Sequence, residues 1–227
     1  MDTNRKTAII VGVLFIVGTV SGVLSVVFSG AMLEVPDYLI QIAANPTRFT
    51  IGALCVLTMG FSLAMIPVVI YPVLKKYNQP LALGYVVFRG ALETFTYFAT
   101  VISWLLLIVL SQEFVKAGAP DGSYFQTLGA LLLKSGDQIN HILKIVFPLG
   151  ALMFNYVLYQ SKLVPRWLSV WGMIGVTLHL AEGLLTLFGL VPASIETIVA
   201  LPIALQEMVF AVWLIVKGFN PAVAAQD

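Results

Sequence analysis

The residues best placed to do chemistry are charged side chains inside long apolar segments. Arg89 and Glu93 stand four residues apart in the apolar segment 81–110, so they share one helix face. Other ionisable groups occupy the later apolar segments: Lys144, His179, Glu182 and Glu207. Charge at membrane depth is costly, and by default it marks a functional or structural pair with partners on neighbouring helices. These six residues are therefore predicted to form a ligand-binding site or a buried charge network.

Two kinds of chemistry fit this set. Arg89 could hold an anionic or carbonyl group of a ligand, while Glu93 or Glu207 could carry a proton, as carboxylates do in proton-linked carriers. Alternatively, the charges only satisfy one another and fix the register of the helices. We expect Arg89 to take its main partner, most plausibly Glu207, from another helix, which leaves Glu93 freer to face a cavity.

A metal site is the weaker reading. Asp137 and His141 are four residues apart and His179 and Glu182 are three apart, and two histidines with two carboxylates could ligate zinc or iron. The sequence lacks a His-Glu-x-x-His motif, a nucleophile elbow and a phosphate loop. We therefore predict no catalytic residue, no metal and no cofactor, and we do not favour an enzyme.

Composition places the chain in a membrane. Of its 227 residues, 59% are hydrophobic and only 10% are charged, whereas a soluble domain averages roughly 25% charged residues. The net charge of +1 provides no large basic field that would attract nucleic acid. The hydrophobic composition makes the lipid bilayer the predicted partner. The single cysteine, Cys55, excludes an intrachain disulfide.

The apolar segments predict an all-α fold. We expect one domain, 1–227, whose six transmembrane helices pack in one bundle over residues 8–29, 49–74, 81–110, 138–160, 167–189 and 195–216. The first segment is too long for a signal peptide and is read as a retained helix. Ser123 and Gln126 form a capping box that opens a short helix, about 123–134, which is too short to span and should lie on the extracytoplasmic surface or act as a lid.

The distribution of basic residues predicts the orientation. With the N-terminus inside, seven lysines and arginines face the cytoplasm: Arg5, Lys6, Lys75, Lys76, Lys162, Arg166 and Lys217. Three remain on the opposite side: Arg48, Lys116 and Lys134. This follows the positive-inside rule, and six crossings return the C-terminus to the cytoplasm.

Several stretches are similar to a known family. They are residues 74–85 (Leu-Lys-Lys-Tyr-Asn-Gln-Pro-Leu-Ala-Leu-Gly-Tyr) running on to Arg89 and Glu93, residues 159–172 with the specific run Val-Pro-Arg-Trp-Leu-Ser, and residues 119–129. Together they resemble the bacterial integral membrane family filed as "domain of unknown function 4386", over nearly the whole chain. The resemblance implies a multi-pass protein of the bacterial inner membrane. It implies no biochemical activity.

The leading functional prediction is an outward-facing polar site between the third and sixth spans. It would bind, and in one version transport, a small molecule or a lipid group. The first alternative is a structural or regulatory membrane subunit whose buried charges only fix helix packing. A metal-dependent membrane enzyme is the second. A chain with so few helices could also form a homodimer.

Overall fold

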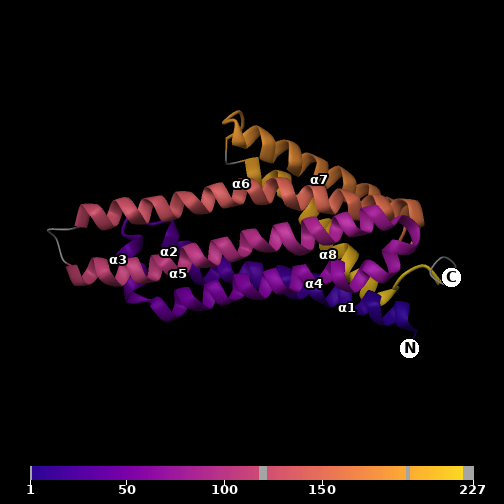
Figure 1. The fold of residues 1–227 in the computed structure, drawn as a ribbon, viewed down its shortest axis with the longest axis horizontal. Helices are drawn as coiled ribbons and strands as arrows, with labels where there is room; N and C mark the ends of the chain where they lie inside the picture. Colours follow the sequence, from indigo (N-terminus) through magenta and orange to yellow (C-terminus); the bar gives the residue numbers. More distant parts are fainter. Residues whose placement is uncertain (1, 118–121, 193–194, 222–227) are drawn as a thin grey trace. The chain divides into compact units, whose positions relative to one another are not determined.

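The computed structural model describes residues 2–117, 122–192 and 195–221, and its regular structure is entirely helical (Figure 1). The all-α prediction is confirmed for these residues. In chain order the helices are α1 (Thr3–Ser25), the π-helical η1 (Val26–Gly30), α2 (Ala31–Leu33), α3 (Tyr38–Ala44), α4 (Pro46–Tyr85), the π-helical η2 (Val86–Glu93), α5 (Thr94–Ala117), α6 (Gly122–Ser161), α7 (Arg166–Leu187) and α8 (Glu196–Val216).

Five helical stretches of the described chain are long and apolar enough to cross a membrane: Thr3–Leu33, Pro46–Ala117, Ser123–Ser161, Arg166–Leu187 and Glu196–Val216. The chain is therefore a multi-pass membrane protein by length and composition. The second stretch has 72 residues, which is several times the roughly 20 residues that one crossing needs. Its internal geometry shows how that length is accommodated.

The 72-residue stretch reverses direction at Asn78. Asn78 has non-helical backbone angles (φ −156°, ψ 91°), and its Oδ1 accepts a hydrogen bond from the backbone N–H of Leu81 at 3.1 Å. That is the bond an N-capping residue makes, so a new helix begins here. Further on, a Cβ built on Gly90 would lie 3.4 Å from Cγ of Pro67, so η2 returns alongside the earlier part of α4.

The predicted short helix 123–134 is wrong as a separate element. Helix α6 runs without a break from Gly122 to Ser161, through the predicted lid and the predicted fourth span together. Residues 134–138 include Gly136 but no proline, and one glycine costs a helix only about 1 kcal/mol relative to alanine. The Ser135 hydroxyl donates back to the Leu132 carbonyl oxygen at 2.7 Å, so its polar group is satisfied within the helix.

The helix that contains the third apolar segment continues beyond that segment. Helix α5 continues through the polar residues that begin at 111 and ends at Ala117. The Ser111 hydroxyl donates to the Ile108 carbonyl oxygen at 2.7 Å. Lys116 and Glu113 form an ion pair of 2.7 Å on the same helix face. Such local side-chain bonds extend a helix past its apolar part. The turn signal at 118–121 lies outside the described residues.

Contacts divide the chain into two compact units. Unit 1 consists of residues 1–17, 61–94 and 141–227, and unit 2 of residues 18–60 and 95–140. Unit 2 has a core of Met32, Leu39, Ile42, Phe49 and Leu107. Every predicted site residue except Asp137 belongs to unit 1. The single domain expected from the sequence stays a prediction.

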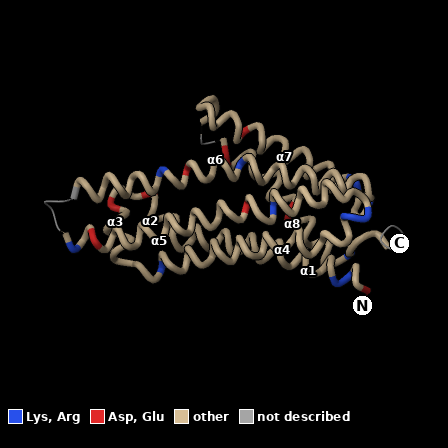
Figure 2. Tube along the Cα trace, in the orientation of Figure 1, with Lys and Arg blue, Asp and Glu red and all other residues tan. Residues whose placement is uncertain are grey.

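Within unit 1, the first turns of α1 lie against the end of α8. The Arg5 guanidinium donates to three carbonyls in the last turn of α8: Leu214 at 3.0 Å, Ile215 at 2.6 Å and Val216 at 3.3 Å. An arginine here satisfies carbonyls that have no partner within the helix and complements its dipole. Lysines and arginines gather at this end of unit 1 (Figure 2).

Candidate functional site

Arg89 and Glu93 lie in the π-helical segment η2. Both are buried: Arg89 is 2% exposed and Glu93 is 1% exposed. Short π-helical segments inside α-helices are rare and frequently occur at functional sites. Helix α6 approaches closely at Gly150, where a Cβ would lie 3.2 Å from the backbone nitrogen of Arg89. Glycine at that position therefore allows α6 to pack directly on the backbone that carries the arginine.

Arg89 pairs with two carboxylates. Its Nη2 lies 3.1 Å from Oε1 of Glu207 on α8, and its Nε lies 3.4 Å from Oε2 of Glu93. The closer partner comes from another helix, so the prediction that Arg89 pairs with Glu207 is confirmed. The expectation that Glu93 is left to face a cavity is wrong, because its carboxylate is enclosed beside Arg89.

Two aromatic rings also lie near the guanidinium. The Cζ atom of Arg89 lies 4.8 Å from the ring centroid of Phe147 and 5.7 Å from that of Phe15. At these distances the negative face of a ring attracts a cation, and the attraction is stronger where water is excluded. The arginine is therefore stabilised by rings as well as carboxylates, and its position is closely fixed.

A second charge cluster forms around Lys144 on α6. Its Nζ lies 3.1 Å from Oε1 of Glu182 on α7 and 3.0 Å from Oε2 of Glu196 at the start of α8. The side chains of Lys144 and Glu182 are each 3% exposed, whereas that of Glu196 is 36% exposed. One lysine thus connects three helices of unit 1.

The Glu182 carboxylate has further neighbours on its own helix. Its Oε1 accepts a hydrogen bond of 2.7 Å from Thr186 Oγ1. Its Oε2 lies 3.9 Å from His179 Nδ1, which is too long for a hydrogen bond. At the next residue, Gly183, a Cβ would lie 2.7 Å from the Cβ of Lys144, so glycine lets α7 come close enough for the ion pair.

Phe147 contacts both clusters. One contact is with the Arg89 guanidinium, and the other is an edge-on contact with the His179 ring at 5.8 Å between centroids. Each cluster combines one cation with two carboxylates. With every glutamate ionised and His179 neutral, each cluster would carry a formal charge of −1.

A family model described as "Domain of unknown function (DUF4386)" matches residues 10–218. The chain belongs to this family. The resemblance noted in the sequence is therefore confirmed, and both charge clusters fall within the matched range. No curated protein and no solved structure matches this DUF4386 protein.

Neither charge cluster lines any of three pockets on this protein. Three pockets, of about 560, 420 and 200 Å³, are lined by residues at 162–166 and 213–221, by residues at 208–217, and by residues near Tyr38. The predicted open polar cavity is not among them. The most accessible members of the clusters are Glu196 and Glu207, whose side chains are 36% and 19% exposed.

The weak metal candidates gain no support from the geometry. Among the residues that the structure describes, no three histidines, cysteines or carboxylates lie together in a way that could hold a metal ion. His179 and Glu182 are neighbours, and Asp137 is exposed. No observation therefore favours the metal-dependent enzyme.

Three members of the clusters were missed by the sequence reasoning: Phe15, Phe147 and Glu196. Phe147 follows Lys144 by three residues, so helical spacing places it on a neighbouring part of the same face. Glu196 begins the last apolar segment, and an acidic residue in the first turn of a helix is usually explained by the helix dipole alone. Nothing in the sequence marked Phe15 as a neighbour of Arg89, because a single phenylalanine is common in an apolar helix.

Proposed function

We propose that this protein binds a small molecule or lipid group that carries a negative charge or a carbonyl, and that Arg89 is the residue that holds it. Glu207 would be the group that the ligand displaces. The observation that carries this proposal is the difference between the two carboxylates beside Arg89. Glu207 is 19% exposed and comes from another helix, whereas Glu93 is 1% exposed and lies one turn along the same helix.

An exchange at Arg89 suits the electrostatics of the cluster. An incoming carboxylate or phosphate replaces the Glu207 carboxylate, so the arginine keeps a charged hydrogen-bond partner throughout. The displaced Glu207 can take up a proton, which offsets the negative charge that the ligand brings to the buried cluster. Ligand binding would then be linked to proton uptake, the property on which proton-coupled carriers depend.

The membrane arrangement that we propose has six crossings. The reversal at Asn78 divides the stretch Pro46–Ala117 into two, which raises the five candidate stretches to six. The excess of basic residues on one side, seven against three, supports an orientation with both termini in the cytoplasm. The setting that fits this family resemblance is the bacterial inner membrane.

The test uses purified protein in lipid nanodiscs and three probes: acetate, oleate and inorganic phosphate. The measurement is the shift of the thermal unfolding midpoint with each probe for the wild type, Arg89→Gln, Glu207→Gln and the control Glu113→Gln, whose carboxylate is exposed and pairs with Lys116. At least one probe should stabilise Glu207→Gln more than the wild type, because Arg89 has lost an ionised competitor. Arg89→Gln should lose the shift, and Glu113→Gln should behave as wild type.

Two results would contradict the binding function. The first is a probe shift that persists unchanged in Arg89→Gln. The second is a folded Glu207→Gln variant that responds to no probe. Because Glu207→Gln leaves Arg89 and Glu93 in place, it keeps the test decisive even where Arg89→Gln fails to fold.

The second candidate is a structural role, and the burial of the clusters favours it. Arg89, Glu93, Lys144 and Glu182 are each 4% exposed or less, and every cation has a carboxylate within 3.4 Å. A closed and paired network is the arrangement expected of charges that only fix helix packing. In that case Glu207→Gln changes the unfolding midpoint without changing the response to any probe.

A further inference from the structure

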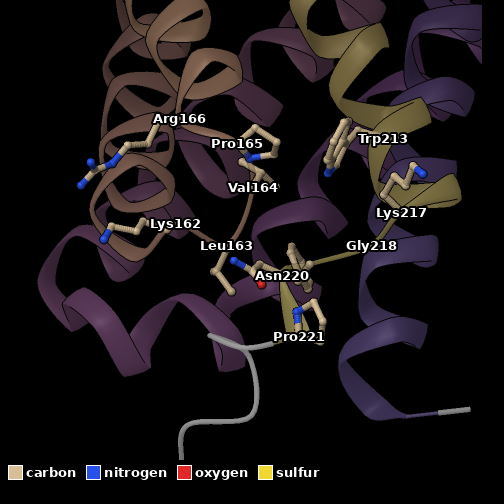
Figure 3. A pocket seen from close by; sticks show the side chains of 11 residues that line it. Lys162, Leu163, Val164, Pro165, Arg166, Trp213, Lys217, Gly218, Asn220 and Pro221 are labelled. Atoms are coloured by element: carbon tan, nitrogen blue, oxygen red, sulfur yellow. The ribbon is translucent and has the colours of Figure 1, made fainter.

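A pocket of about 560 Å³ lies in unit 1 where α8 ends beside the turn between α6 and α7 (Figure 3). Three of its lining residues, Leu163, Val164 and Phe219, are buried. The backbone N–H of Asn220 donates to the Leu163 carbonyl oxygen at 2.8 Å. This bond ties the segment after α8 to the α6–α7 turn. The volume is within the range of roughly 300–1,000 Å³ typical of ligand sites.

The charge of this pocket is positive. Among the described residues, its lining includes three cations, Lys162, Arg166 and Lys217, and no carboxylate. In Figure 3, Lys162 and Arg166 extend from the α6–α7 turn on one side and Lys217 directly follows α8 on the other, with the charged ends of the two groups pointing away from each other. All three are exposed at the surface, and lysine side chains are long and flexible. An anion placed between the two sides would be reached after the exposed lysine side chains change rotamer, and Arg166, whose Cζ lies 4.9 Å from the ring centroid of Tyr159, would have to leave that ring.

An apolar groove of about 420 Å³ continues from the pocket along α8. It is lined by Met208, Val209, Val212 and Val216, and it shares Trp213 and Lys217 with the basic pocket. From Met208 to Lys217 the helix rises about 13 Å, which is a large part of one membrane leaflet. Tryptophan is enriched where apolar and polar regions of a membrane meet, and Trp213 stands at this junction.

We propose that the pocket and groove together bind one anionic phospholipid of the surrounding bilayer. Lys162, Arg166 and Lys217 hold the phosphate of the headgroup, and an acyl chain lies in the groove along α8. The basic pocket explains the choice of an anionic over a zwitterionic lipid. The groove favours a lipid over a soluble phosphate, because only a lipid has an acyl chain that can contact the apolar side chains of the groove.

The test is native mass spectrometry of the full chain released from detergent after addition of phosphatidylglycerol or of phosphatidylethanolamine with the same acyl chains. One variant carries Lys162→Gln, Arg166→Gln and Lys217→Gln. Its matched control loses three basic residues that line neither pocket nor groove, through Lys6→Gln, Lys75→Gln and Lys76→Gln. A second pair consists of Val212→Trp, which fills the groove, and Ile174→Trp, which adds the same bulk on exposed α7.

We expect the wild type to retain phosphatidylglycerol in preference to phosphatidylethanolamine. The pocket variant should lose affinity by about fivefold for each cation removed, while the matched control keeps it. Val212→Trp should weaken binding of phosphatidylglycerol, and Ile174→Trp should not.

Three outcomes would overturn the proposal. Equal retention of the two lipids would remove the role of charge, and equal loss in both triple variants would reduce the effect to general surface attraction. The third is displacement of the lipid by millimolar glycerol phosphate together with unchanged binding in Val212→Trp. That result would identify a soluble phosphate site instead. Neither lipid variant touches Arg89, so this test and that of the Arg89 site succeed or fail separately.

Discussion

Arg89 shows how a buried cation is stabilised in this protein. It has a carboxylate on its own helix, a closer one on α8, and aromatic rings from α1 and α6 within 6 Å of the guanidinium. Removing one partner of a buried ion pair is much more harmful than replacing the whole set by apolar groups, because the remaining charges lose their compensation. This asymmetry can be measured.

We expect Arg89→Leu to lower the free energy of unfolding by about 3–5 kcal/mol, because Glu93 and Glu207 are left together without a cation. The triple variant Arg89→Leu, Glu93→Leu, Glu207→Leu should recover a large part of that loss. Denaturant unfolding in detergent micelles, followed by circular dichroism, gives both values. A triple variant no more stable than Arg89→Leu would contradict the assignment of the three residues to one cluster.

At the scale of the element, close helix contacts position the charges. Glycines at 150 and 183 let α6 meet the backbone of η2 and let α7 meet α6, next to Arg89 and Glu182 respectively. Gly136 is different, because a Cβ there would meet nothing within 4 Å. The same substitution should therefore have opposite effects at the two kinds of position.

Gly136→Ala is expected to stabilise the protein by about 0.5–1 kcal/mol, because alanine favours the helix and α6 has room for it. Gly183→Ala is expected to destabilise it, because the new methyl group would lie 3.0 Å from the Lys144 carbonyl oxygen and push α7 away. The measurement is the unfolding midpoint of each variant. Destabilisation by Gly136→Ala would contradict the continuous helix through residue 136.

The continuity of α6 also shows where local sequence patterns lose their force. Polar residues and a glycine at 134–138 lower helix propensity only slightly, and a capping box at 123 marks a helix start without fixing its end. The sequence pattern of residues 122–161 therefore predicts two helices, although the structure has one. Contacts such as Ser103 Oγ donating to the Leu132 carbonyl at 3.1 Å, which joins α5 and α6 in unit 2, have no counterpart in the sequence.

At the scale of the whole molecule, the proposed topology assigns each loop to one side of the membrane. It can be tested in a Cys55→Ala background, because Cys55 is the only cysteine. We expect Lys116→Cys and Lys134→Cys to react with a membrane-impermeant maleimide in intact cells. Lys75→Cys and Lys162→Cys should react only after permeabilisation.

Other labelling results would contradict different parts of this topology. The reverse pattern would contradict the positive-inside orientation. Labelling of Lys75→Cys and Lys116→Cys from the same side would contradict a crossing between Asn78 and Ala117.

The helical class, the membrane setting, the family and most of the charged residues that become buried follow from the sequence alone. Hydropathy and helical spacing are local properties that add along the chain, so they can be read without a fold. It also indicated the Arg89–Glu207 pair, because few carboxylates lie at similar depth. Three features are visible only in the folded protein: Glu93 is enclosed, Glu196 pairs with Lys144, and Phe15 and Phe147 lie beside Arg89. These facts depend on which helices touch and at what rotation, and no local pattern contains that information.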